Sequence, residues 1–198
     1  MQKYLSTVVK SVPPSGIRKF FDLVSQTEGV ISLGVGEPDF VTPWHIREAS
    51  YYSLEKGYTM YTSNSGLLEL REEIANYTKK AIGIEYSPQD EVLVTVGVSE
   101  AIDIALRALI EPGDEVLVPE PSFVSYAPGA TLAYGKAISV PTYDKDEYRL
   151  KADELEKLIT PKSKVLILAY PNNPTGAIME AEDLQEIVDI VIKNDLIV

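Results

Sequence analysis

The sequence predicts an α/β fold with a mostly parallel sheet and flanking helices. Two observations predict this class. Short apolar runs rich in Val, Ile and Leu recur along the chain, as is typical of strands buried on both faces. Segments with helical spacing of apolar residues separate these runs, so that strand and helix alternate. The 198 residues, 45% of them apolar, are enough for one well-buried domain.

The expected elements follow from these two patterns. Strands are expected at six runs: Val30–Leu33, Val92–Val96, Glu115–Pro119, Ala137–Val140, Lys164–Ala169 and Leu196–Val198. Helices are expected around residues 67–77, 102–110 and 184–191. Residues 1–44 are interrupted by Pro and Gly, so we expect an N-terminal arm or a partial second domain there. The sequence ends within the last run, which favours a domain that continues past it.

Composition excludes several classes of function. Thirty acidic residues against eighteen basic ones give a net charge of −12, which opposes binding to nucleic acid or to an anionic membrane. The absence of Cys excludes disulfides and a cysteine nucleophile, and His45 is the only histidine available for a metal site or a Ser/His/Asp triad. No secretion signal or membrane span is apparent, so we expect a cytoplasmic protein.

Gly97-Val98-Ser99 joins a predicted strand to a predicted helix. Ligands of α/β sheets gather at the carboxyl ends of strands, near helix N-termini. Gly97 permits close approach of the backbone, Ser99 can cap the helix, and the N–H groups of the first turn attract an anion such as phosphate. The alternative is an ordinary capped turn.

Asn172-Asn173-Pro174-Thr175-Gly176 follows the run at residues 164–169 and precedes another predicted helix. Prolines stiffen this loop, and an asparagine amide at the end of a strand can hydrogen-bond an oxygen of a planar ligand. The alternative is a rigid turn whose asparagine side chains bond only to their own backbone.

Two further stretches resemble ligand-binding loops. Gly36 lies in a glycine-containing segment after an apolar run, where a free N–H could meet a substrate carboxylate. Tyr61 lies beside Asn64-Ser65-Gly66, and its phenol could bind a phosphate. A plain turn and ordinary packing of the tyrosine are the respective alternatives.

Five motifs together resemble one family. They are Gly36–Phe40, Tyr61–Gly66 leading into Leu70-Arg71, Gly97–Ser99, Pro121–Phe123 and Asn172–Gly176. They occur in the order and spacing of the fold-type I aminotransferases that use pyridoxal 5'-phosphate (PLP), the aspartate and aromatic aminotransferase group. The chain resembles the N-terminal half of these enzymes. Residues 45–198 would then be the N-terminal portion of the PLP-binding large domain, incomplete at its C-terminus, and residues 1–44 an arm and part of the small domain.

The resemblance assigns a cofactor role to six residues, five of which would act within their own subunit. It implies that Gly97, Val98 and Ser99 bind the PLP phosphate through backbone and side chain. It further implies that Phe123 stacks on the pyridine ring and that Asn173 hydrogen-bonds the phenolic oxygen of the ring.

The resemblance also implies partners. The N–H of Gly36 would meet the substrate carboxylate, and Tyr61 would reach the phosphate bound by a neighbouring subunit, so a homodimer is expected. Similar enzymes have cis peptide bonds before the prolines that match Pro121 and Pro174. The implied substrates are an amino acid and a 2-oxo acid, with members of the group acting on aspartate, aromatic amino acids or N-acetyl-diaminopimelate.

The expected function is therefore transfer of an amino group from an amino acid to a 2-oxo acid. The resemblance places the lysine that forms the Schiff base beyond Val198, so no catalytic residue is assigned and the 198-residue chain alone is expected to be inactive. Lys162-Ser163-Lys164 is interpreted as a solvated turn. A PLP-dependent carbon–sulfur β-lyase and a non-catalytic truncated fragment remain as alternatives.

Overall fold

The computed structural model describes residues 2–14, 29, 31, 36 and 38–198. The chain divides into two compact units, one formed by Met1–Ser15 with Ser99–Val198 and the other by Gly16–Val98. Each unit is described by itself. The predicted boundary between residues 44 and 45 concerns the domains of the whole protein and stays a prediction.

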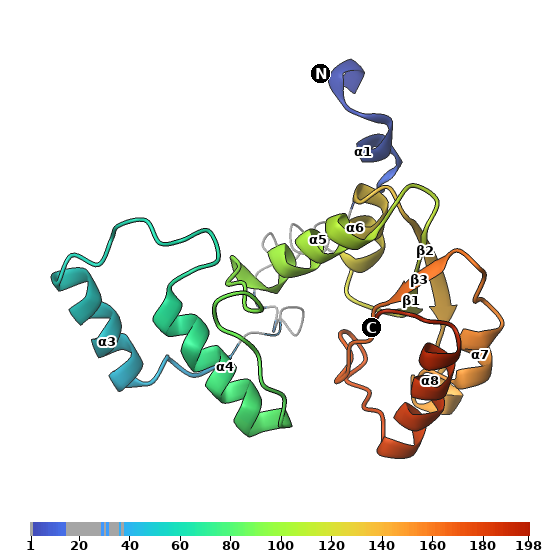
Figure 1. The fold of residues 1–198 in the computed structure, drawn as a ribbon. Helices are drawn as coiled ribbons and strands as arrows, with labels where there is room; N and C mark the ends of the chain where they lie inside the picture. Colours follow the sequence, from blue (N-terminus) through green and yellow to red (C-terminus); the bar gives the residue numbers. More distant parts are fainter. Residues whose placement is uncertain (1, 15–28, 30, 32–35, 37) are drawn as a thin grey trace. The chain divides into compact units, whose positions relative to one another are not determined.

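A parallel sheet forms the centre of the first unit (Figure 1). Its strands are β1 (Glu115–Glu120), β2 (Lys136–Pro141) and β3 (Ser163–Leu166), in the order β2-β1-β3. The ladder between β1 and β2 runs in parallel register along all of β1. These strands confirm the α/β class, and β1 and β2 agree with the predicted runs to within a residue at each end.

The edge of the sheet beside β3 differs somewhat from the prediction. β3 ends at Leu166, although the N–H of Ile167 still donates to the carbonyl of Leu117 at 3.0 Å. Ile197 pairs in parallel with Val165, and its N–H donates to the carbonyl of Lys164 at 2.9 Å. The predicted run at residues 196–198 therefore lies beside β3 as a further extended segment.

Helices cover both faces of this sheet. Helices α5 (Gly97–Leu109) and α6 (Tyr126–Leu132) cover one face, and α7 (Ala152–Glu156) and α8 (Ala181–Lys193) cover the other (Figure 1). Val116 and Val118 of β1 pack with Leu106 of α5. Leu117, between them in sequence, packs on the opposite face with Ile187 of α8. The side chains of Val116, Leu117 and Val118 are all fully buried, which explains why these consecutive residues of β1 are all apolar.

Three short elements complete the first unit. They are η1 (Gln2–Tyr4), α1 (Thr7–Ser11) and the 3₁₀ turn η2 (Asp144–Asp146). Ser6 caps α1, because its hydroxyl accepts a hydrogen bond from the N–H of Val9 at 3.2 Å.

The second unit contributes helices α3 (Trp44–Glu55) and α4 (Leu68–Ile82). The predicted strand at residues 92–96 is not a strand in the structure. The N–H of Val94 donates instead to the carbonyl of Ser65 at 3.0 Å, so this segment is held by a loop rather than by a neighbouring strand. The predicted strand Val30–Leu33 lies mostly outside the described residues. Within the described part of the chain, no helix has both the length and the apolar character that a membrane span requires.

Candidate cofactor site

Two loops lie side by side at the carboxyl edge of the sheet. One follows β1 and carries Phe123, and the other follows β3 and carries Asn173. Because β1 and β3 are adjacent and parallel, both loops leave the sheet at the same edge. The side-chain amide of Asn172 joins them by donating to the carbonyl of Pro121 at 3.3 Å.

The two asparagines of the second loop have different surroundings. The side-chain oxygen of Asn172 accepts hydrogen bonds from the N–H of Thr175 at 3.1 Å and from its hydroxyl at 2.8 Å. Its backbone carbonyl accepts from the N–H of Gly176 at 2.8 Å. Asn173 is exposed, and within the described residues no hydrogen bond involves its side chain. Asn172 therefore builds the loop, which leaves the amide of Asn173 able to bind a ligand.

The other loop presents an aromatic ring. Phe123 is 36% exposed, and its ring meets Tyr126 edge to face with the centroids 5.5 Å apart. A cavity of about 660 Å³ beside it is lined by residues 11–14, by residues 120–125 and by part of α6. The peptide bonds before Pro121 and Pro174 are cis, as predicted, and the bond before Pro171 is also cis.

Helix α5 begins at the predicted phosphate-binding turn. Gly97 has a φ of +77°, a left-handed conformation that favours glycine, and its carbonyl accepts from the hydroxyl of Thr95 at 3.0 Å. Val98 and Ser99 are both exposed at this end of the helix, and the N–H groups of a first helical turn commonly bind partners outside the helix. Leu106 anchors the same helix in the core. Of the predicted cofactor residues, Ser99, Phe123 and Asn173 belong to the first unit.

Tyr61 and Gly36 belong to the second unit. The Tyr61 side chain is fully exposed. The loop after it is fixed by Arg71, which is buried and donates to the carbonyls of Gly66 at 3.2 Å and Pro88 at 2.6 Å. The sequence identified Arg71 only as part of a motif and did not predict this role. Gly36 is exposed, and most of its neighbours in sequence lie outside the described residues.

The predicted solvated turn at Lys162-Ser163-Lys164 is only partly right, because Ser163 and Lys164 are the first two residues of β3 and are partly buried. Both lysines lie at the opposite edge of the sheet, where β3 begins. The ammonium of Lys164 pairs with Asp114 at 2.9 Å, and the carbonyl of Lys162 accepts from the N–H of Glu115 at 2.8 Å. The hydrogen bond from the N–H of Glu111, followed by that from Lys164, holds the pKa of Asp114 below its ordinary value. Lys162 and Lys164 are thus at the other end of β3 from Asn173.

Comparison with known proteins agrees with this geometry. The family described as "Aminotransferase class I and II" matches residues 28–198. The aromatic-amino-acid aminotransferase 2 of Thermococcus litoralis is 50% identical over 98% of this chain and 50% of its own length. The aspartate aminotransferase of Pyrococcus abyssi is 50% identical over 94% of this chain and 48% of its own length. The crystal structure of Pyrococcus protein-A1 superposes with a TM-score of 0.92 at 50% identity, covering 96% of this chain and 49% of that one.

The fold defines the class of parallel α/β proteins, in which ligands commonly bind at the carboxyl edge of the strands. The family match narrows this class, and the chain belongs to the class I and II aminotransferases. It spans about half the length of the curated relatives that it matches.

Proposed function

We propose that the protein of which this chain forms part is a PLP-dependent aminotransferase that moves an amino group from an amino acid to a 2-oxo acid. The observation that carries the proposal is the pair of joined loops at the carboxyl edge of β1 and β3. One loop offers the ring of Phe123, and the other offers the amide of Asn173, which forms no hydrogen bond with any residue that the structure describes. An aromatic surface beside an amide donor suits a planar heteroaromatic ligand that carries a phenolic oxygen.

The proposed role of these residues is to bind and orient the cofactor. Phe123 stacks on the pyridine ring and shields that face from water. Asn173 donates a hydrogen bond to the phenolic oxygen, which fixes the rotation of the ring in its plane. Gly97, Val98 and Ser99 hold the phosphate at the start of α5. When bound, PLP supplies the electron sink that transamination requires.

The rest of the proposed site lies outside this group of residues. Gly36 meets the substrate carboxylate through its N–H, and Tyr61 reaches the phosphate bound by a second copy of the chain in a homodimer. The full exposure of the Tyr61 side chain supports a contact with a second subunit. The lysine that forms the Schiff base and moves the proton is proposed to lie outside these 198 residues.

The substrate class stays broad in this proposal. Two relatives with the same 50% identity are named for different substrates, an aromatic amino acid and aspartate, so identity alone does not choose between them. The proposal therefore extends to an amino acid and a 2-oxo acid without naming either.

Product analysis of the full-length protein tests the reaction. With PLP, an amino donor and a 2-oxo acid, we expect one new amino acid for each donor consumed. Pyruvate and ammonia in place of a new amino acid would show β-elimination. If the full-length protein neither binds PLP nor turns over substrate, the protein is not a catalyst of either reaction.

A pair of neighbouring variants tests the cofactor role of Asn173. Asn173→Ala should weaken PLP binding about tenfold, since a lost hydrogen bond contributes about 1.4 kcal/mol, and should leave the free energy of unfolding unchanged. Asn172→Ala is the matched control, because it removes the bonds to Thr175 and Pro121 and should lower stability by about 1–2 kcal/mol. Fluorescence titration with PLP and urea unfolding separate the two effects. Equal PLP affinity for Asn173→Ala and the wild type would refute the assigned role.

A further inference from the structure

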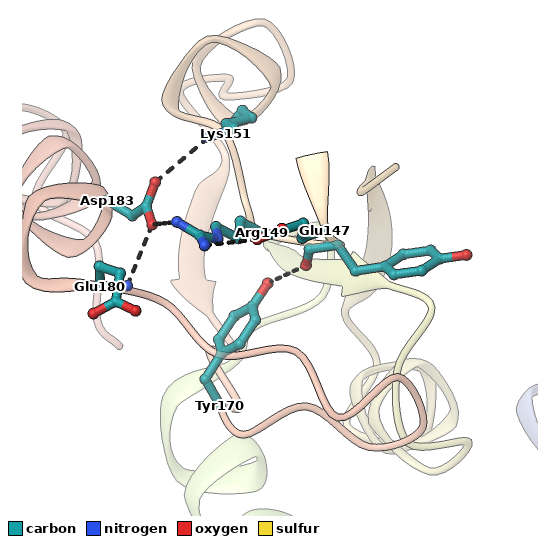
Figure 2. A network of polar contacts seen from close by, with 7 residues as sticks. Glu147, Arg149, Lys151, Tyr170, Glu180 and Asp183 are labelled. Atoms are coloured by element: carbon teal, nitrogen blue, oxygen red, sulfur yellow. Dashed lines mark hydrogen bonds and ion pairs between the residues drawn. The ribbon is translucent and has the colours of Figure 1, made fainter. Parts of the chain in front are cut away.

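One short segment is bonded to both ends of the Asn173 loop (Figure 2). Before the loop, the hydroxyl of Tyr170 donates to the backbone carbonyl of Tyr148 at 3.0 Å. After the loop, the carboxylate of Asp183 accepts from Arg149 at 3.1 Å and from Lys151 at 3.4 Å. Residues 148–151 therefore contact both Tyr170, directly before the loop, and Asp183, after it. We call this set of contacts the loop clamp.

The backbone of the clamp segment is held in an unusual conformation. Glu147 and Tyr148 have φ values of 54° and 57°, in the left-handed region that residues other than glycine seldom occupy. The N–H of Tyr148 donates to the carbonyl of Tyr143 at 2.9 Å, which closes the turn. Such a conformation persists only where surrounding contacts hold it. The carbonyl that receives the Tyr170 hydroxyl is thus fixed in direction by its own turn.

The charged part of the clamp is well formed. The side chain of Asp183 is 15% exposed, and it also accepts from the N–H of Glu180 at 3.2 Å, as part of a capping box at the start of α8. Burial raises the pKa of Asp183, but the hydrogen bonds from Glu180 and Arg149 outweigh it, so the pKa lies below its ordinary value. Arg149 is held from its other side by Glu147 at 2.7 Å. The Asp183 carboxylate is therefore ionised and has a fixed cationic partner at neutral pH.

Tyr170 links this polar clamp to the apolar base of the loop. Its ring lines a cavity of about 300 Å³ with Pro171, Ile178 and Met179, and Leu184 of α8 lies on the same cavity. Burial is the main cause of a raised pKa for the Tyr170 phenol, so the hydroxyl stays protonated and can donate. A change in the χ1 rotamer of Tyr170 would therefore break the hydrogen bond to Tyr148 and disturb the packing around the start of the loop.

We propose that Tyr170 is a positioning residue that orients the amide of Asn173 for the cofactor through its hydrogen bond to Tyr148. The inference rests on the proposed function, because the target of Asn173 is PLP. Tyr170 itself touches no reacting atom in this proposal. It acts by fixing the start of the loop, three residues before Asn173.

Tyr170→Phe in the full-length protein tests the proposal, since it removes the hydroxyl and keeps the ring. We expect PLP affinity to fall about fivefold, less than the tenfold loss in Asn173→Ala, because a misplaced Asn173 amide loses only part of its hydrogen bond to PLP. Amide hydrogen exchange in peptides covering residues 171–179 should become faster, whereas peptides from β1 should be unaffected. Tyr143→Phe is the matched control, because its phenol is 41% exposed and forms no hydrogen bond within the described part of the chain. It should alter neither measurement.

A double-mutant cycle separates positioning from general stabilisation. If Tyr170 acts through Asn173, the variant with both Tyr170→Phe and Asn173→Ala should bind PLP no more weakly than Asn173→Ala alone. Losses that add, or wild-type affinity in Tyr170→Phe, would overturn the proposal. Failure of the wild-type protein to bind PLP would instead refute the proposed function, and the positioning role with it.

Discussion

Gly66 shows how one residue fixes the loop that begins at Tyr61. Its φ is +95°, and a Cβ atom added to it would lie 2.6 Å from the Cβ of Val94. The adjacent carbonyl of Ser65 accepts a hydrogen bond from the N–H of Val94 at 3.0 Å. The close approach of the two backbones at this point therefore requires the absence of a side chain.

Gly66→Ala should destabilise the protein more than a glycine replacement that meets only backbone strain. The left-handed conformation contributes about 1–2 kcal/mol and overpacking against Val94 about 1–3 kcal/mol. Gly83→Ala is the control, because Gly83 has a φ of +75° at the C-cap of α4 but open space around its Cβ position. Gly83→Ala should therefore lower the free energy of unfolding by only about 1–2 kcal/mol, the contribution of the left-handed conformation. Urea unfolding of both variants measures the difference, and equal losses would contradict the close contact with Val94.

For single residues, the resemblance singled out Asn173 for the cofactor, but the sequence could not predict the hydrogen bonds by which Asn172 holds the loop. The two residues are identical in type and adjacent in the chain. Their difference arises from contacts with Thr175 and with Pro121, which is 51 residues away from Asn172. The loop clamp could not be predicted from the sequence either, because it depends on the left-handed backbone of Glu147 and Tyr148.

Among the elements, β1 was predicted well because both faces of the strand are buried and Val116, Leu117 and Val118 at its centre are apolar. The run at residues 92–96 is similarly rich in Val and Leu, yet it is not a strand. Pairing depends on a neighbouring strand, and the N–H of Val94 bonds to the loop at Ser65 instead. In this run Leu93 is 51% and Val96 88% exposed, so apolar composition alone indicates neither burial nor hydrogen-bond partners.

The first residue of β1 gives the fold a dependence on pH. Glu115 is buried, and its carboxylate accepts from the hydroxyls of Thr160 at 2.7 Å and Ser163 at 3.2 Å and from Lys136 at 3.4 Å. The Thr160 hydrogen bond is the largest cause that holds the pKa of Glu115 below its ordinary value of 4.5. A lowered carboxyl pKa stabilises the fold above pH 4.5, and this stabilisation is lost as the pH falls through the folded-state pKa.

Glu115→Gln should therefore be less stable than the wild type at pH 7, with the difference shrinking as the pH falls below 4.5. Urea unfolding between pH 3 and pH 7 measures this trend. Glu186→Gln, on the exposed side of α8, is the control and should follow the wild-type curve. A constant difference between Glu115→Gln and the wild type across this range would contradict the assigned pKa shift.

At the scale of the whole molecule, the proposed homodimer makes Tyr61 part of the partner's cofactor site. Mixing two variants tests this arrangement. In a hybrid dimer of Tyr61→Phe and Ser99→Ala subunits, one site should carry both defects and the other should carry neither. PLP titration of the purified hybrid should therefore show one site of wild-type affinity per dimer. Two equally weakened sites would show that Tyr61 and Ser99 of the same subunit act together.

In the proposed site, Ser99, Phe123 and Asn173, from three different segments of one unit, surround a single molecule of PLP. A crystal structure of the full-length protein with PLP tests this arrangement most directly. The expected result places the Ser99 hydroxyl on the phosphate, the Phe123 ring against the pyridine ring and the Asn173 amide on the phenolic oxygen. A complex in which these three side chains do not touch the same bound cofactor would contradict the account.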